Sequence, residues 1–181
     1  MRKFRSESKA ASTREYARFP HLFRQIGQPS TRFVAVPKVV SSSRLYYTVD
    51  YLSNDIIVGD KIFAVPDANG LQFALLSSSM FITWQKTVGG RLKSDVSFGS
   101  TLTWHTFPVP KLEEKTRERI IKAGQKVLDA RALHPERSLA EHYAPLSMAP
   151  ELVKAHDALD KEVDKAMGAT RKLTTERQRQ E

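Results

Sequence analysis

Hydrophobic periodicity changes at Pro108-Val109-Pro110, and this change constrains the fold more than any other feature of the chain. Before these prolines, short β-branched and aromatic runs alternate with polar residues, which is typical of strands. After them, apolar residues recur every three or four positions, as they do along one face of a helix. The sequence therefore predicts an α+β fold: a small mixed β-sheet with a packed core helix, followed by a C-terminal helical segment.

Short strands and one helix are expected before the prolines. The expected strands are residues 32–40, 45–51, 56–58, 61–66 and 101–107. Pro37 is expected at an edge or bulge because it cannot donate to a sheet. Residues 71–88 have helical spacing, with large apolar side chains four apart at Leu76, Met80, Trp84 and Val88. Such residues usually pack, so we interpret 71–88 as one buried helix that ends at Gly89-Gly90.

Two longer helices are expected after the prolines. The first covers 113–133, with acidic residues in its first turn, and His134-Pro135 stops it. Ser138 and Glu141 have the spacing of a capping box, which opens a short helix. Pro150 is placed to start the next helix and Gly168 to end it.

These signals divide the chain into four parts. We expect a flexible basic arm at 1–17, a first domain at 18–110, a helical segment at 111–168 and a frayed polar tail at 169–181.

Positive charge is concentrated before the prolines. The net charge is +9. Up to Pro110 the chain has 14 Lys and Arg and 7 Asp and Glu, whereas after Pro110 it has 15 Lys and Arg and 13 Asp and Glu. An excess of this kind indicates a polyanionic partner, most often a nucleic acid. The charge-rich but nearly balanced second part is typical of solvated helices.

Several classes of function are excluded by what the sequence lacks. The chain has no cysteine, which rules out disulfides and thiolate metal sites and favours a cytoplasmic location. No segment is long and apolar enough to span a membrane, so no membrane partner is expected. P-loop and dinucleotide fingerprints are absent, and the histidines lack metal-binding spacing beside a carboxylate: His21, His105, His134, His142 and His156. We therefore expect neither catalytic residues nor a metal site.

Residues 89–95 form the strongest candidate for a binding loop. Gly89 and Gly90 allow a ligand to approach the backbone closely. Arg91 and Lys93 can reach phosphates, and an arginine can also bond both acceptors of a guanine edge. An ordinary basic surface loop, with Lys93 paired to Asp95, explains the same residues, and the loop alone does not decide between the two.

Several short motifs follow one another in a fixed order. They are Val39-Val40-Ser41-Ser42-Ser43-Arg44, residues 73–84, Gly90-Arg91-Leu92-Lys93-Ser94-Asp95 and Thr106-Phe107-Pro108-Val109-Pro110. The second part adds Val127-Leu128-Asp129-Ala130-Arg131, Leu139-Ala140-Glu141-His142-Tyr143 and Lys154-Ala155-His156-Asp157-Ala158-Leu159-Asp160. Together they resemble the C-terminal part of MmeI-like DNA methyltransferases, the type IIL restriction-modification enzymes. Many motifs in one order are more specific than any single motif.

The resemblance implies a target-recognition domain at 18–110 that reads a sequence in double-stranded DNA. In such enzymes an upstream domain binds S-adenosylmethionine and methylates adenine N6 with an Asn-Pro-Pro-Tyr-type motif. That motif and the glycine-rich cofactor loop are absent here. The resemblance therefore implies the DNA-reading end of the enzyme, with no cofactor in this chain and a catalytic methyltransferase domain or subunit as partner.

The resemblance also implies which residues contact DNA. The candidates are Lys38, Ser42, Ser43, Arg44, Tyr46, Arg91, Lys93 and Ser94. The family commonly has an acidic residue at the position of Ser43, in the neighbourhood that sets base preference. The recognised DNA sequence therefore cannot be transferred from the family.

Two other hypotheses belong to different classes. In the first, the chain is a protein-interaction module whose helical segment docks on a catalytic subunit through its apolar stripes. Such a face, if left exposed, would also favour a homodimer. In the second, the chain is a small enzyme, but no catalytic set is visible. Salt-dependent DNA binding separates DNA recognition from protein docking.

Overall fold

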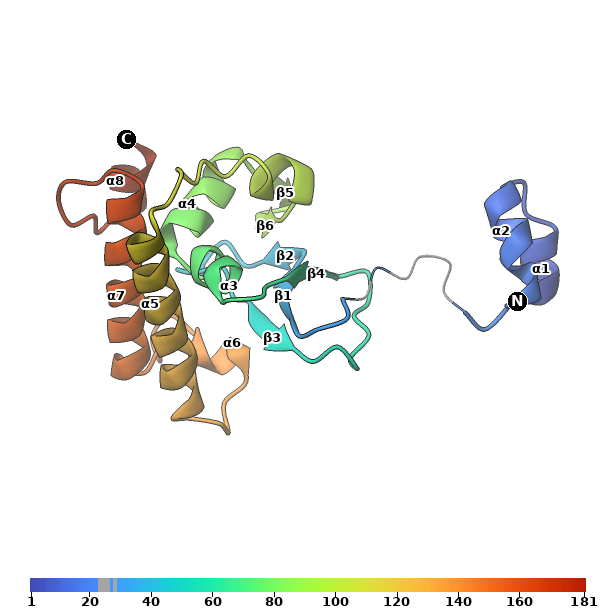
Figure 1. The fold of residues 1–181 in the computed structure, drawn as a ribbon, viewed down its shortest axis with the longest axis horizontal. Helices are drawn as coiled ribbons and strands as arrows, with labels where there is room; N and C mark the ends of the chain where they lie inside the picture. The colour runs from blue at the N-terminus through green and yellow to red at the C-terminus, as the bar shows by residue number, and fades with distance from the viewer. Residues whose placement is uncertain (23–26, 28) are drawn as a thin grey trace.

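A computed structural model describes residues 1–22, 27 and 29–181. It confirms the α+β class and the helical second part (Figure 1). The strands form two small three-stranded sheets, and every pairing in them is antiparallel, in place of the expected mixed sheet.

The first sheet has the order β3-β1-β4. Its central strand β1 (Phe33–Pro37) pairs with β3 (Asp50–Leu52) and with β4 (Ile62–Pro66). Four of the five β1 residues are buried, which explains why this strand is continuously apolar. Pro37 is the last residue of the strand, where a missing N–H costs least. Residues 56–58, expected as a strand, lie outside both sheets.

The second sheet has the order β2-β6-β5. β2 (Val39–Val40) pairs with β6 (Asp95–Ser97), which also pairs with β5 (Gly90–Leu92). Lys38 alone separates β1 from β2. Its N–H donates to the Lys61 carbonyl at 2.8 Å, and its own carbonyl accepts from the Phe98 N–H at 2.8 Å. The backbone of Lys38 therefore joins the two sheets.

The expected core helix is divided into α3 (Leu71–Leu76) and α4 (Ser79–Val88). Ser78 causes the break, because its hydroxyl donates to the Leu75 carbonyl at 2.7 Å and accepts from the Phe81 N–H at 3.2 Å. It thus acts as the N-cap of α4. The break also turns the buried face of α4, which carries Phe81 and Ile82 where the four-residue spacing predicted Met80 and Trp84.

Two of the strand predictions, 101–107 and most of 45–51, are wrong because tertiary packing of their side chains prevents strand geometry. The π-helical turn Ser100–Trp104 replaces the first part of the strand expected at 101–107, because Trp104 and Phe107 both pack their rings against Phe81 of α4. Side chains three positions apart cannot share one face of a strand.

Residues 45–51 reach strand geometry only at their end. Tyr46 and Tyr47 are adjacent and both buried, which a half-buried strand does not allow.

The second part consists of α5 (Glu114–Ala132), α6 (Leu139–His142), α7 (Pro150–Ala166) and α8 (Glu176–Gln180). The capping box of Ser138 and Glu141 is present, and Pro150 is the first residue of α7. Gly168 has a φ of 102°, and its N–H and that of Ala169 bond back to α7, forming the expected glycine C-cap. None of the described helices combines the length and apolarity that a membrane crossing requires.

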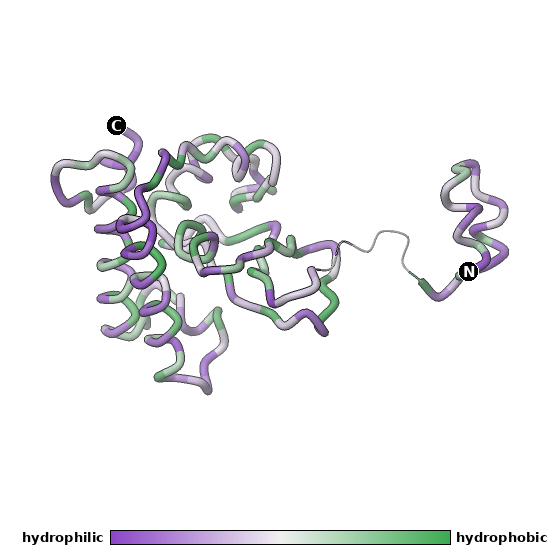
Figure 2. Tube along the Cα trace, viewed as in Figure 1, coloured by the Kyte–Doolittle hydropathy of each residue, from purple (hydrophilic) through white to green (hydrophobic). Residues whose placement is uncertain are grey.

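A single hydrophobic core contains side chains from both parts of the chain. α5 and α7 lie side by side, and each carries apolar and polar residues in turn along its length (Figures 1 and 2). α5 also packs on α3, where Gly124 meets Ala74 so closely that an added Cβ would lie 2.6 Å from the Ala74 Cβ. The helical segment is therefore docked on the first domain, as its apolar stripes predicted.

The N-terminal residues fold into α1 (Arg2–Ser6), α2 (Ala11–Glu15) and the 3-10 turn η1 (Tyr16–Arg18). Arg5 ties these pieces together by donating to the carbonyls of Tyr16, Phe19 and Leu22. None of residues 1–22 is buried, and Figure 1 draws them apart from the remainder of the molecule.

Candidate nucleic-acid interface

The two segments that the sequence singled out meet at one edge of the second sheet. β2 leads directly into the turn 41–44, and β5 and β6 form the hairpin that contains Lys93 and Ser94. The Ser42 N–H donates to the Asp95 carboxylate at 3.3 Å across 53 positions of sequence. We call the turn 41–44 together with residues 91–94 the polar edge.

Lys93 occupies the tip of the hairpin with an uncommon backbone conformation. Leu92 and Asp95 pair with each other, so Lys93 and Ser94 form the connecting turn. Lys93 has a φ of 57°, and it is the one residue other than glycine with positive φ in the described part of the chain. Its side chain is exposed, and Asp95 bonds to Ser42 rather than to Lys93. The two-residue turn accounts for the positive φ, and the exposed cation at its tip is free to contact a ligand.

Arg91 fastens the hairpin to the neighbouring helix. One terminal nitrogen donates to the Ser94 carbonyl at 3.3 Å, and the other donates to the Lys86 carbonyl at the end of α4 at 3.2 Å. The guanidinium is still exposed. Arg91 can thus hold the loop and present its remaining N–H groups to a ligand.

The turn 41–44 is ordered by its own serines and by the helical segment. The Ser41 and Ser43 hydroxyls are 3.0 Å apart, and Ser42 and Ser43 are exposed. Arg44 is half-buried and donates to the Ala140 carbonyl of α6 at 3.2 Å. Arg44 therefore joins the polar edge to the C-terminal helices.

The two remaining candidates, Lys38 and Tyr46, are not exposed at the polar edge. Lys38 is half-buried, with its ammonium 5.3 Å from the centre of the Phe63 ring. Tyr46 is buried, and its ring stacks on the imidazole of His156 at 3.7 Å. Burial raises the pKa of Tyr46, so this side chain is a neutral part of the core.

A buried polar network beneath the turn includes residues to which the sequence gave no role. Arg131 donates twice to the Tyr143 oxygen, at 3.0 and 2.5 Å, and once to the Val49 carbonyl at 2.8 Å. The Tyr143 hydroxyl is therefore left to donate to Nε2 of His156, 2.7 Å away. Burial, with the nearby Arg131 charge, lowers the pKa of His156 well below its usual value, so the imidazole is neutral.

This network links α5, α6 and α7 to the segment that carries the turn 41–44. A cation or histidine within an otherwise apolar helix face was the available signal for it. Arg131 lies four residues after Val127, and His156 lies four residues after Leu152, so each shares a helix face with a buried apolar residue. The network fixes the positions of these elements, because the hydrogen bonds of Arg131 and Tyr143 join them directly.

A small α+β domain with two polar segments at one sheet edge, braced by docked helices, defines a target recognition module. The chain belongs to the MmeI family: residues 1–111 match the MmeI target recognition domain, and residues 112–181 match the MmeI C-terminal domain. This confirms the family resemblance of the sequence motifs.

Two relatives extend this result. DNA methyltransferase A of Bacillus subtilis (strain 168) is 34% identical over 162 residues, which are 90% of this chain and 18% of that protein. A solved structure of the type IIL restriction-modification enzyme MmeI in complex with DNA matches with a TM-score of 0.88 and 36% identity. The match covers 98% of this chain and 24% of the MmeI chain. The chain thus spans less than a quarter of the length of either relative.

Proposed function

We propose that this chain reads a specific sequence in double-stranded DNA, as the specificity end of an adenine-N6 DNA methyltransferase or restriction-modification enzyme. The observation that carries the proposal is the polar edge, where the turn 41–44 and the tip of the β5–β6 hairpin lie together. The solved relative in complex with DNA supports it, as does the excess of positive charge before Pro110.

The hairpin has a shape that suits DNA. A two-stranded β-ribbon fits the major groove, where base edges present distinct patterns of donors and acceptors. Lys93 projects from the tip of such a ribbon, and Ser42 and Ser43 lie beside it. Phosphate contacts position a protein and base contacts specify the sequence. We assign the first role to Lys93 and the second to Arg44, whose guanidinium is held at a fixed place by Ala140.

Methyl transfer is assigned to another domain or subunit of the same enzyme. That domain would bind S-adenosylmethionine and flip the target adenine out of the duplex, which requires a separate module to hold the register. This chain would bind no cofactor and would transfer no methyl group alone. It would work where the DNA is, in the cytoplasm.

Selection from a random pool tests the proposed function. The 181-residue chain is immobilised, incubated with randomised duplexes at low salt, and the retained DNA is sequenced. We expect one sequence to be enriched, with unrelated DNA bound at about 10⁻⁴ to 10⁻⁶ M at physiological salt. Affinity should fall steeply as salt rises, because phosphate contacts release counterions. Absence of enrichment, or affinity that does not respond to salt, would contradict the proposal.

The structure gives less support to docking through the apolar stripes. Ile120 and Val127 of α5 and Leu159 of α7 are fully buried within the chain. The faces that would bind a catalytic subunit, or a second copy of this chain, are therefore already occupied. A catalytic partner would have to bind other surfaces.

A further inference from the structure

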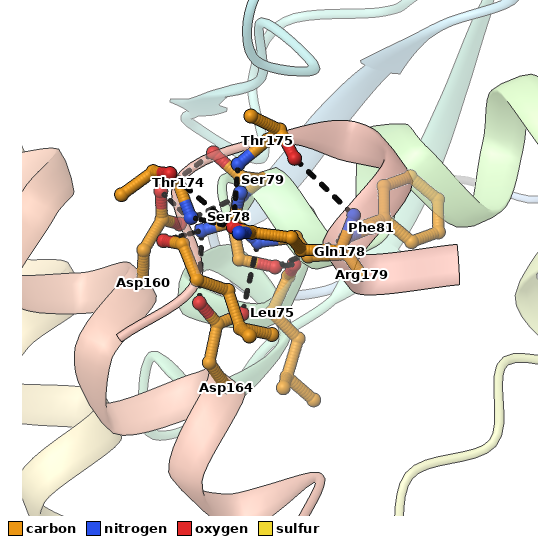
Figure 3. Close-up of polar contacts among 11 residues, drawn as sticks. Leu75, Ser78, Ser79, Phe81, Asp160, Asp164, Thr174, Thr175, Gln178 and Arg179 are labelled. Atoms are coloured by element: carbon orange, nitrogen blue, oxygen red, sulfur yellow. Dashed lines mark hydrogen bonds and ion pairs between the residues drawn. The ribbon is translucent and has the colours of Figure 1, made fainter. Parts of the chain in front are cut away.

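The last helix, α8, is fastened to α7 by buried charges (Figure 3). Arg179 donates to both carboxylate oxygens of Asp164, at 3.0 and 2.8 Å, and lies 3.6 Å from Asp160. All three side chains are less than a tenth exposed. The tail was expected to fray because it is polar, but it meets acidic partners that α7 presents.

Asp160 extends this contact to the start of α4. Its carboxylate accepts from the Ser79 N–H at 2.7 Å and from the Ser79 hydroxyl at 2.5 Å. Ser79 is the first residue of α4, where free N–H groups and the helix dipole favour a negative charge. A pair of residues on α7 therefore holds both α8 and the N-terminus of α4.

α8 also holds the other end of α4. Lys86 forms an ion pair with Glu176, and the Gln180 side chain donates to the Thr87 hydroxyl at 3.1 Å. The C-terminal helices α7 and α8 therefore bond to α4 at both of its ends.

The final turn of α4 in turn holds the hairpin of the polar edge. The Gln85 side chain donates to the Ser97 carbonyl of β6 at 2.8 Å, and the Lys86 carbonyl accepts from Arg91 of β5. Gln85 reaches β6 across Gly89, where an added Cβ would lie 2.1 Å from the Gln85 amide nitrogen. Each strand of the hairpin is thus bonded directly to α4.

We propose that Arg179 is a positioning residue for DNA reading: its clamp on Asp164 and Asp160 fixes α4, and α4 fixes the direction of the β5–β6 hairpin. The residue touches no DNA in this account. It acts through three hydrogen-bonded links, from α8 to α7, from α7 to α4 and from α4 to the hairpin. The link to DNA reading rests on the proposed function, whereas the clamp itself is a property of the chain.

Spin labels can test the clamp without DNA. The chain has no cysteine, so Ser94→Cys at the hairpin tip and Lys126→Cys on the exposed face of α5 allow clean labelling. Pulsed electron spin resonance then gives the distribution of distances between the two labels. Arg177→Met is the matched control, since Arg177 lies on α8, is exposed and pairs with Glu181 alone among the described residues.

We expect a narrow distribution of label-to-label distances in the labelled chain without further changes and in Arg177→Met. In Arg179→Met we expect this distribution to be shifted or broadened. With DNA, Arg179→Met should reduce the preference for the selected duplex over a one-base variant by about tenfold, the effect of one lost base contact. Both variants remove one positive charge, so their affinities for unrelated DNA should agree.

Unchanged label distances in folded Arg179→Met would overturn the proposal, even if the parent reads DNA. If the unmutated chain shows no sequence preference, the proposed function is refuted. The label distances would then still show whether the Arg179 clamp fixes the hairpin. If Arg179→Met does not fold, Arg179→Met combined with Asp164→Asn removes both charges of the buried pair, which proteins tolerate better than an orphaned charge.

Discussion

At the scale of single residues, Lys93 combines a strained backbone with a free charge. Its φ of 57° costs an L-residue roughly 1–2 kcal/mol, whereas glycine adopts it freely. We expect Lys93→Gly to leave the free energy of unfolding unchanged or raise it by up to about 1 kcal/mol, since glycine also gains freedom in the unfolded chain. The same change should weaken binding to all duplexes.

Urea unfolding and fluorescence anisotropy with labelled duplexes measure the two effects. Lys93→Ala is the control, because it removes the charge but keeps the strain, so it should lose affinity without gaining stability. Undiminished DNA affinity in Lys93→Gly would show that the charge serves no binding function.

Arg44 should behave differently from Lys93. We expect Arg44→Ala to relax sequence preference at one position and to cost about 1–3 kcal/mol of binding free energy there. Lys93→Ala should instead lower affinity for all sequences alike. Competition binding against a set of duplexes, each changed at one base pair, separates the two patterns. A uniform loss in Arg44→Ala would mean that it contacts the phosphates or only joins the turn to α6.

At the scale of elements, the α3–α5 contact depends on Gly124. Alanine is favoured over glycine inside a helix by about 1 kcal/mol, but at this position its Cβ would meet Ala74. Overpacking of this kind costs about 1–3 kcal/mol. We therefore expect Gly124→Ala to lower the free energy of unfolding, as measured in urea. Lys126→Ala, on the exposed face of the same helix, should be nearly neutral, and a stabilised Gly124→Ala would contradict the close contact.

The α7–α8 clamp should depend on pH. Burial raises the pKa of Asp160 from its usual value to about 6, against the opposing hydrogen bonds of Ser79 and charge of Arg179. Asp164 from α7 and Tyr46 also face this carboxyl, and burial raises the pKa of Asp164 as well. Because the pKa of Asp160 is higher in the folded state, its contribution to the free energy of unfolding is largest below about pH 4. That contribution declines as the pH rises through about 6.

Arg179 offsets this decline by stabilising the ionised carboxylates. We therefore expect Arg179→Met to lose more stability at pH 8 than at pH 5, with about 3–5 kcal/mol lost at pH 8, as for other broken buried pairs. Urea unfolding at the two pH values measures the difference. An equal loss at both would mean that Arg179 contributes packing rather than charge.

At the scale of the whole molecule, the two parts share one core and should not fold separately. Ile120, Val127, Leu152, Leu159 and Val163 of the helical segment are fully buried in the cluster that also contains Val34 and Leu76. Helices in proteins draw most of their stability from tertiary packing of an apolar face, and the first domain would expose the face that these helices cover. We expect a chain that ends at Lys111 to show no cooperative thermal unfolding by circular dichroism. An unchanged melting temperature would make the helices an independent appendage.

The sequence by itself determined the α+β class, the family resemblance and the features with local partners. The capping box of Ser138, the start of α7 at Pro150 and the glycine cap at Gly168 need only residues within about one helical turn, so their patterns are legible in the chain.

Tertiary structure decided what depends on distant residues. The turn 41–44 meets the hairpin through a bond that spans 53 positions, and α8 is held in place by Asp160 and Asp164, which another helix presents. Packing against Phe81 turned residues 100–104 into a π-helical turn despite their alternation, and Tyr46 turned into the core. The spacing of hydrophobic residues along the sequence indicates only which face of a segment is apolar. The partner that covers that face is set by the fold.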